Sequence, residues 1–222
     1  MNDFDPVKYK AMVKSFQEND DPLGWFDSIY TDAKGDHNNV FWADLKANPY
    51  LLQWFEQSSP NTQGKSAIAI GCGVGDDAQA LSQMGYKVTA FDISPEAIRL
   101  CKKRYPDSSV HYLVADLFNY PNAWKENFDI VYECNTIQVL PGKYRIQARA
   151  SMVSLLAHNA SILVSCRSRE KGKQEDAIPL PLDKDEMNGF IQCGLKQTSF
   201  LSYEDNQKPP VPHFFATYKR VD

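Results

Sequence analysis

Strand-like and helix-like segments alternate from Lys65 onward, and this alternation constrains the fold more than any other feature of the sequence. Short apolar runs predict strands, and the amphipathic runs between them predict helices. The expected strands span 67–70, 87–91, 110–115, 128–132 and 161–166, and the expected helices span 78–84, 95–105 and 144–156. Strands and helices at this spacing require a parallel sheet with helices on both faces.

The end of the chain departs from this alternation. Residues 195–203 and 213–220 predict two long strands, and the segment between them, Glu204 to Pro212, leaves no room for a crossover helix. Strands joined in this way form an antiparallel hairpin, which we expect at one edge of the sheet. The predicted fold is therefore α/β, a doubly wound, seven-stranded, mostly parallel sheet with a C-terminal antiparallel hairpin.

The first sixty residues predict a helical layer. Apolar residues recur at helical intervals over 6–16 and 22–30, with Asp5 and Asp21 as N-caps before a proline. Asn48, followed by Pro49, repeats that signal for a third helix.

This layer is also rich in aromatic residues, because it holds three of the four tryptophans, Trp25, Trp42 and Trp54. It either packs on the sheet as a cover or acts as a lid that contacts a ligand. We expect one domain over 1–222, with the layer or lid as residues 1–60 and an α/β core as residues 61–222.

Composition excludes several classes of protein. The formal net charge of -4 argues against tight binding of nucleic acid, which needs clustered positive charge. No run is apolar enough to span a bilayer, and the acidic start lacks the order of a secretion signal. The five cysteines form no CxxC pair, so neither a metal site nor a disulfide framework is expected. We expect a cytoplasmic monomer or homodimer.

The densest chemistry lies in a glycine turn, Ile70-Gly71-Cys72-Gly73-Val74-Gly75-Asp76-Asp77. Glycines after a first strand let bare backbone approach a ligand at the start of the next helix. A nicotinamide fingerprint needs a third glycine at position 76, where this chain has Asp76. Acids at this helix start repel a pyrophosphate and suit a ligand with a sulfonium and an ammonium group. S-adenosylmethionine is such a ligand.

Acids also end the following strands. Asp92, after the second strand, can accept hydrogen bonds from both ribose hydroxyls, and Asp116, after the third, can accept one from the adenine amino group. Ile93 and Leu117 stand beside them and could sandwich the adenine.

Gly71-Cys72-Gly73-x-Gly75, together with Asp92-Ile93-Ser94, resembles the class I S-adenosylmethionine-dependent methyltransferases, and the resemblance runs from Lys65 to the C-terminus. It implies a Rossmann-like methyltransferase fold and S-adenosylmethionine as cofactor. The expected cofactor contacts are Gly71, Cys72, Gly73, Gly75, Asp77, Asp92, Ile93, Asp116, Leu117, Glu133 and Trp42.

More narrowly, the chain resembles the branch that contains thiopurine, halide/thiol and tellurite methyltransferases. The marks are the tryptophan-containing N-terminal region, Asp77, and Leu140-Pro141-Gly142 with Arg145. Two departures stand out. The acid that many members carry two residues before the first glycine is Ala69 here, so Asp76, Asp77 or Glu133 could take its role. Glu133-Cys134-Asn135 replaces the Asp-Arg-Gly of thiopurine enzymes, which puts thiopurine-like substrates in doubt.

The predicted function is methyl transfer to a small molecule in an enclosed, partly aromatic pocket. A soft acceptor, such as a thiol, halide or chalcogen nucleophile, needs no general base, and no catalytic residue is assigned. The candidate acceptor contacts are Tyr30, Gln138, Arg145, Arg167 and His213. The alternatives are a non-catalytic S-adenosylmethionine-binding sensor or scaffold, and a nicotinamide-dependent reductase.

Overall fold

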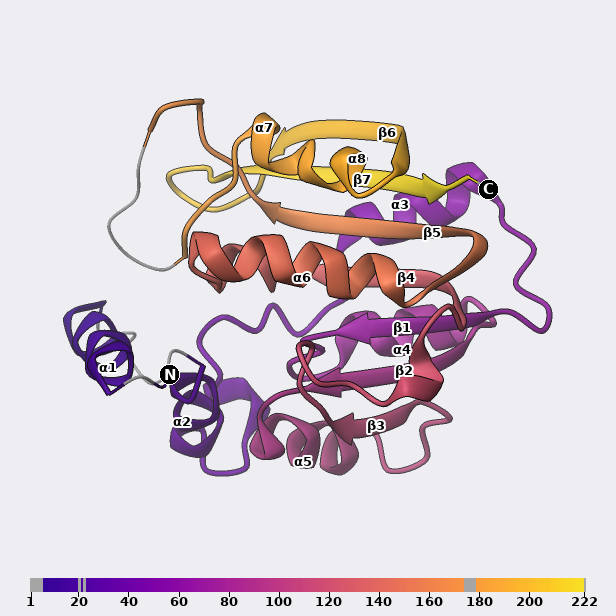
Figure 1. The fold of residues 1–222 in the computed structure, drawn as a ribbon. Coiled ribbons are helices and arrows are strands. Elements are labelled where there is room, and N and C mark those ends of the chain that lie inside the picture. Colours follow the sequence, from indigo (N-terminus) through magenta and orange to yellow (C-terminus); the bar gives the residue numbers. More distant parts are fainter. Residues whose placement is uncertain (1–5, 20, 22, 174–178, 222) are drawn as a thin grey trace.

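The computed structural model describes residues 6–19, 21, 23–173 and 179–221, and its centre is a seven-stranded sheet (Figure 1). The strand order is β3-β2-β1-β4-β5-β7-β6. The strands are β1 (Ser66–Ile70), β2 (Lys87–Asp92), β3 (His111–Val114), β4 (Phe128–Cys134), β5 (Leu156–Arg167), β6 (Leu195–Glu204) and β7 (Pro212–Arg220). The predicted fold class is confirmed.

β7 is the reversed strand of the sheet. It pairs antiparallel with both β5 and β6, while all the pairs among β1 to β5 are parallel. The hairpin predicted from residues 195–203 and 213–220 is therefore present, with β6 as the outer strand. β5 begins at Leu156, earlier than predicted, because the chain leaves its helix at Ser154 and Leu156 pairs with Phe128.

Helices cover both faces of the sheet, as predicted. One face carries α3 (Pro49–Ser58), α4 (Asp76–Gln83) and α5 (Pro95–Arg104), whose apolar residues form one core cluster with the sheet. The other carries α6 (Gly142–Ser154), α7 (Lys184–Met187) and α8 (Gly189–Gln192) in a second cluster. The short helices α7 and α8 were not expected from the sequence.

The connection from β3 to β4 has only a 3-10 turn, η2 (Asn122–Trp124), where the other parallel crossovers have an α-helix. The ring of Trp124 fills this space. Its centroid lies 5.4 Å from that of Phe91 and 6.3 Å from that of Phe128. A large aromatic ring thus covers the apolar surface that a helix covers elsewhere.

The part of the N-terminal layer that precedes α3 lies at the edge where the parallel strands end, which we call the carboxyl edge (Figure 1). It contains α1 (Pro6–Glu18) and α2 (Trp25–Asp32), which meet around the fully buried ring of Trp25. The ring centroid of Trp25 lies 5.6 Å from that of Tyr9 in an edge-to-face contact.

Two of the predicted helix starts can be compared with the structure. The side chain of Asn48 caps α3 by accepting from the amide of Tyr50 at 2.9 Å, as predicted. The prediction of a helix from residue 22 was wrong, because Asp21 instead accepts from the amide of Gly24 at 2.9 Å and α2 starts at Trp25. The third proposed cap, Asp5, lies outside the described residues.

Candidate functional site

The glycine turn leaves β1 in a conformation that only glycine adopts easily. Gly71, Gly73 and Gly75 have φ values of 59°, 54° and 92°, in the left-handed region. Space is also short, because a Cβ on Gly71 would stand 2.5 Å from Oγ1 of Thr136 and one on Gly75 would stand 2.7 Å from the hydroxyl of Tyr112. The turn therefore presents bare backbone at the carboxyl edge.

Asp92 holds this turn in place. Its Oδ2 accepts from the amide of Gly73 at 3.0 Å, and its Oδ1 accepts from the amide of Ser94 at 3.0 Å. Burial raises the pKa of Asp92 to about 6. Each carboxylate oxygen keeps a further lone pair, so the same group can support the turn and accept another hydrogen bond.

The three other residues predicted around the adenine differ in exposure. Ile93 is exposed and Asp116 is half-buried, whereas Leu117 belongs to the core cluster beneath the sheet. Oδ1 of Asp116 accepts from the amide of Phe118 at 2.8 Å. Their contact with adenine stays a prediction.

Asp76 does not leave a free charge at the start of α4. Arg104 binds it with two hydrogen bonds, of 2.7 and 2.8 Å, in a partly buried ion pair. A guanidinium paired in this way neutralises the carboxylate. Asp76, Asp77 and Glu133 were the candidates to replace the acid missing at Ala69. Among these three, Asp76 is the one that forms an ion pair with a cationic side chain.

Asp77 fastens the N-terminal layer to the sheet. Its Oδ1 accepts from the amide of Asn48 at 2.7 Å, and its Oδ2 accepts from the hydroxyl of Tyr132 at 2.9 Å. Burial raises the pKa of Asp77 to about 6. Both oxygens therefore have partners within the chain.

Glu133 has an unused acceptor. Its Oε2 accepts from the amides of Thr136 and Ile137 at 3.0 and 3.2 Å, but its Oε1 is buried with no partner among the described residues. The side chain is fully buried, which raises the pKa of Glu133 to about 8. Because Glu133 pairs with Ile70, the residue before the turn, this oxygen belongs to a group beside Gly71. A buried carboxylate oxygen without a donor requires an explanation.

Tyr30 and Trp42 meet over the turn. The hydroxyl of Tyr30 lies 3.2 Å from the position a Cβ would take on Gly73, and it accepts from Nε1 of Trp42 at 3.3 Å. Cys72, within the turn, is half-buried, and its hydrogen bond with Cys101 and its burial raise the pKa of the thiol well above its usual value. The N-terminal layer thus contacts the predicted cofactor site directly.

On the acceptor side, two of the candidate residues bind other parts of the chain. Oε1 of Gln138 accepts from the amide of Arg167 at 2.6 Å. The guanidinium of Arg145 is buried and donates to the carbonyls of Leu140 and Leu180 and to Glu186. Contact of Gln138 or Arg145 with an acceptor stays a prediction.

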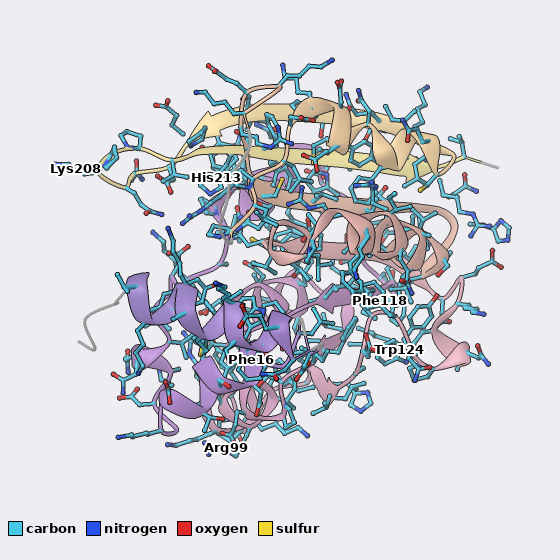
Figure 2. The ribbon with its side chains drawn as sticks, turned by 60° about the vertical axis from the view of Figure 1, so that its left-hand side comes forward. Phe16, Arg99, Phe118, Trp124, Lys208 and His213 are labelled. Atoms are coloured by element: carbon cyan, nitrogen blue, oxygen red, sulfur yellow. The ribbon has the colours of Figure 1, made fainter. Side chains whose placement is uncertain are left out.

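Arg167 and His213 stand side by side at the carboxyl edge. They are register partners across β5 and β7, and Tyr203 of β6 is the next in the row. Residues directly opposite in an antiparallel pair share a face. The rings of Tyr203 and His213 stack with centroids 5.3 Å apart. Figure 2, in which this edge comes forward, labels His213 at the start of β7 and Phe16 on α1.

The sequence analysis missed three residues that organise the site, Asn48, Arg104 and Tyr132. Asn48 was predicted only as a helix cap, yet it also donates to Ser165 at 3.0 Å and bonds Asp77. Their spacing along the chain carries no signal, because each meets its partner only through the tertiary fold.

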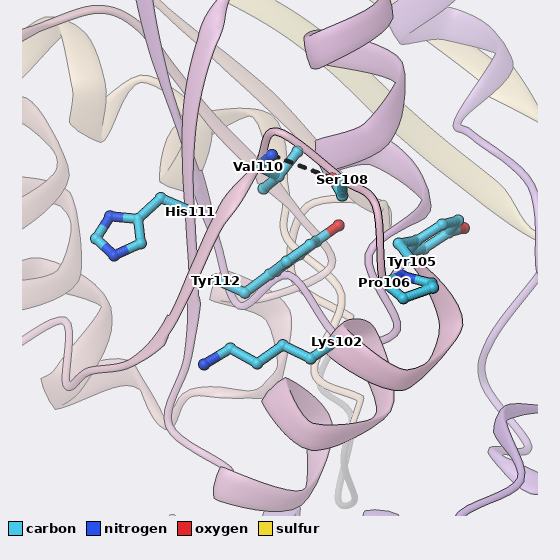
Figure 3. A pocket seen from close by; sticks show the side chains of 7 residues that line it. All are labelled: Lys102, Tyr105, Pro106, Ser108, Val110, His111 and Tyr112. Carbon is cyan, nitrogen blue, oxygen red and sulfur yellow. Dashed lines mark hydrogen bonds between the residues drawn. The ribbon is translucent and has the colours of Figure 1, made fainter.

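Two cavities lie away from the carboxyl edge. One of about 220 Å³ is lined by Lys102, Tyr105, Pro106, Ser108, Val110, His111 and Tyr112 (Figure 3). Another, of about 380 Å³, is lined by residues at the starts of β1, β2 and β4, among them Ser66, Lys87 and Phe128. Ligands of open α/β sheets bind beyond the carboxyl ends of the strands, so we do not assign these cavities to the site. Within the described residues no metal-binding group of three or more His, Cys, Asp or Glu occurs, and no helix is long and apolar enough to cross a membrane.

Comparison with known proteins agrees with this geometry. Residues 67–159 match the family described as "Methyltransferase domain". The ubiquinone biosynthesis O-methyltransferase of Thiobacillus denitrificans is 29% identical over 108 residues, which cover 48% of this chain and 46% of that enzyme. The chain spans about half the length of the curated relatives it matches.

Two solved structures share the fold over most of the chain. The 1,6-didemethyltoxoflavin-N1-methyltransferase of Burkholderia thailandensis, with 1,6-didemethyltoxoflavin and S-adenosylhomocysteine bound, has a TM-score of 0.69 and 16% identity, covering 99% of this chain and 92% of that one. The N-methyltransferase NodS of Bradyrhizobium japonicum, in complex with S-adenosylhomocysteine, has a TM-score of 0.66 and 16% identity, covering 88% and 100%. A methyltransferase domain therefore matches the part of the chain that follows the start of the first strand, and these two methyltransferases share its fold.

Proposed function

We propose that this protein transfers a methyl group from S-adenosylmethionine to a small molecule at the carboxyl edge. The observation that carries the proposal is a cradle of bare backbone at Gly71 to Gly75, flanked by two buried carboxylates, Asp92 and Glu133. Buried carboxylates beside exposed backbone suit a cationic ligand and disfavour a pyrophosphate.

Each part of the cradle has a role in holding the cofactor. The remaining lone pairs of Asp92 would accept from the ribose hydroxyls, and Asp116 would accept from the adenine amino group. Oε1 of Glu133, which has no partner among the described side chains or amides, would accept from the methionine ammonium in place of the acid absent at Ala69. When bound, S-adenosylmethionine supplies a methyl group on a positively charged sulfur that leaves without further activation.

The N-terminal layer is the proposed lid. The hydroxyl of Tyr30, on α2, reaches Gly73, and Trp42, in the segment after α2, donates to that hydroxyl, so a ligand on the turn would contact this pair. Amide hydrogen exchange tests this. Bound S-adenosylhomocysteine should slow exchange in α2 at least as much as in α4, whereas a layer that only covers the sheet would leave α2 unchanged.

Two classes of acceptor atom are candidates, a soft nucleophile and an oxygen. The branch predicted from the sequence methylates thiols, halides or chalcogen nucleophiles, whereas the curated relatives are O-methyltransferases by name. Turnover of labelled S-adenosylmethionine with thiols, halide and tellurite ions, phenols and amines separates these classes.

Binding measurements test the function itself. Calorimetry should show binding of S-adenosylhomocysteine in preference to NADPH, and turnover should follow with one of the acceptor classes. Tight binding of NADPH alone would support a reductase. Binding of the cofactor with no turnover on any acceptor would support a sensor or scaffold.

A further inference from the structure

Arg167 differs from the other arginines of the chain. Its guanidinium has no hydrogen-bond or ion-pair partner in the described part of the chain, although it is half-buried. The other arginines all have such partners: Arg99 with Glu96, Arg104 with Asp76, Arg145 with Glu186, Arg149 with the carbonyl of Glu186, Arg169 with Asp183, and Arg220 with Glu126. A half-buried guanidinium is costly to leave unpaired.

Arg167 lies on the side of the sheet where the acceptor is proposed to bind. It is the last residue of β5, at the carboxyl edge. Burial raises the pKa of Tyr9 on α1 and the positive charge of Arg167 partly opposes this, so the field of the guanidinium reaches α1. Phe215, two residues beyond His213 on β7, packs in the core cluster that contains α3. Side chains two residues apart on a strand share a face, so His213 and its register partner Arg167 lie on the face of the sheet that α3 covers.

His213, the register partner of Arg167, presents one free ring nitrogen. Its Nδ1 lies 2.8 Å from the carbonyl oxygen of Val211. A carbonyl only accepts, so Nδ1 carries the hydrogen and Nε2 of the neutral ring is an acceptor. Within the described residues, the buried side-chain N and O atoms without a partner are Glu133 Oε1 and Thr217 Oγ1, so Nε2 of His213 reaches solvent.

The surroundings keep this ring neutral. Burial lowers the pKa of His213, and the charge of Arg167 on β5 lowers it further. The bond to Val211 and the charges of Asp205, in the β6–β7 connection, and Asp44, in the segment after α2, act in the opposite direction. The stacked ring of Tyr203 faces it from β6. At neutral pH the ring is therefore available as a base.

We infer that Arg167 and His213 form the recognition site for an acidic acceptor, in which Arg167 binds a carboxylate and Nε2 of His213 takes the proton of the nucleophilic hydroxyl. This inference rests on the proposed function. In the reaction the acceptor oxygen forms a bond to the methyl carbon while the carbon–sulfur bond breaks and the sulfur keeps the electron pair. The hydroxyl proton moves to Nε2, which balances the charge. Arg167 and His213 are the catalytic and binding residues of this half of the edge.

The test compares acids with their amides. Hydroxybenzoates and mercaptobenzoates are offered with labelled S-adenosylmethionine, each beside its carboxamide, so that each pair shares a nucleophile and differs only in the carboxylate. We expect kcat/KM for the acids to exceed that for the amides by at least about tenfold, since a hydrogen bond between charged groups is stronger than one to a neutral amide. Arg167→Gln should lower kcat/KM for the acids to the value measured for the amides. Lys171→Gln, which removes an exposed lysine of the following loop, should leave the preference intact.

His213 is tested by its pH profile. His213→Gln should lower kcat for the hydroxyl acceptors by about 100-fold with little change in KM. With S-adenosylmethionine saturating at each pH, it should also remove the fall in kcat/KM for the acceptor on the acid side of neutrality, because no ring is left to protonate. The thiols should lose less, since they ionise near neutral pH themselves. In nuclear magnetic resonance without any acceptor, Arg167→Gln should raise the pKa of His213.

The outcomes separate the inference from the function on which it rests. Equal turnover of acids and amides, or an unchanged pH profile in His213→Gln, would overturn the inference. Binding of S-adenosylhomocysteine without methylation of any acid would also overturn it, while leaving the proposed function to the other acceptor classes. Failure of the unmodified protein to bind S-adenosylhomocysteine would contradict the proposed function itself. Every variant should bind S-adenosylhomocysteine as tightly as the parent, which shows that its fold is intact.

Discussion

The two halves of the carboxyl edge carry opposite kinds of titratable side chain, acids in one half and bases in the other. Around β1, β2 and β4 the side chains are acids, Asp77, Asp92 and Glu133, and burial raises the pKa of each. Around β5 and β7 they are a guanidinium, Arg167, and an imidazole, His213. In the acidic half, a bound cationic cofactor would compensate the free-energy cost of burying carboxylates. In the basic half, a bound anionic acceptor would compensate the cost of leaving Arg167 unpaired. The edge is thus divided by charge, which suits a cationic donor beside an anionic acceptor.

The largest effect is expected where one carboxylate serves both the turn and the ligand. Asparagine at position 92 has one acceptor oxygen for two backbone amides, those of Gly73 and Ser94, so Asp92→Asn leaves one amide facing an amino group. We expect affinity for S-adenosylhomocysteine to fall about 100-fold in calorimetry, and the melting temperature to fall as well.

Asp116→Asn is the matched control, because asparagine can still accept from the amide of Phe118. Asp116→Asn should leave the melting temperature unchanged and lower the affinity for S-adenosylhomocysteine less than Asp92→Asn does. Equal effects of the two substitutions would mean that Asp92 has no special place in the acidic half.

The next effect concerns Glu133 and its proton. With a pKa of about 8, most Glu133 side chains are protonated at pH 7, and pairing with an ammonium lowers that pKa. Cofactor binding should therefore release a proton, and affinity should rise by up to about tenfold between pH 6 and pH 7. Calorimetry in buffers of different ionisation enthalpy counts the protons.

Glu133→Gln should weaken binding at pH 7 by about tenfold and abolish the part of the proton release that comes from Glu133. Glu56→Gln, on the exposed side of α3, controls for the loss of one acid. The same proton count in Glu133→Gln and in the parent would remove Glu133 from the ammonium site.

A smaller effect should come from adding charge to the acidic half. Arg104→Gln removes the cation paired with Asp76 and leaves that carboxylate free at the start of α4. The ratio of affinities for S-adenosylmethionine and neutral S-adenosylhomocysteine should rise about two- to threefold at low salt, and the rise should shrink in 0.5 M salt, where the Debye length is only a few ångströms. A ratio that stays constant would show that charge does not select the donor.

The smallest effect is expected from the hydrogen bond between Tyr30 and Trp42 beside the glycine turn. Tyr30→Phe removes the hydroxyl that accepts from Trp42, so unfolding free energy should fall by about 0.5–1.5 kcal/mol. In a double-mutant cycle with Trp42→Phe the two losses should not add, because both remove the same bond. Additive losses would mean that the bond contributes nothing. Affinity for S-adenosylhomocysteine should change less than twofold.

Local patterns explain which parts of the fold could be predicted. The apolar strands, the Ser94 cap of α5, whose Oγ accepts from Ala97 at 3.0 Å, and the terminal hairpin all depend on neighbours in the sequence. The short helices α7 and α8 have too few residues to show a period. The start of α2 was misplaced because the side chain of Asp21 forms a turn with Gly24 instead of a cap.

The site was less predictable than the fold, because its charges are set by distant partners. Nothing within the glycine turn indicates that Asp76 is neutralised by Arg104, 28 residues away, or that both oxygens of Asp77 are occupied. The same holds for Arg167, whose lack of a partner in the described structure becomes visible only when every neighbouring side chain is placed. Sequence patterns locate a carboxylate, but tertiary contacts decide whether it is free.

The reversed direction of β7 has a practical consequence. Its first residues stand at the carboxyl edge, and Arg220 at its other end anchors to Glu126 and to the carbonyl of Leu156, on the far side of the sheet. A fluorophore or surface tether attached beyond Arg220 would therefore leave the reaction edge unobstructed.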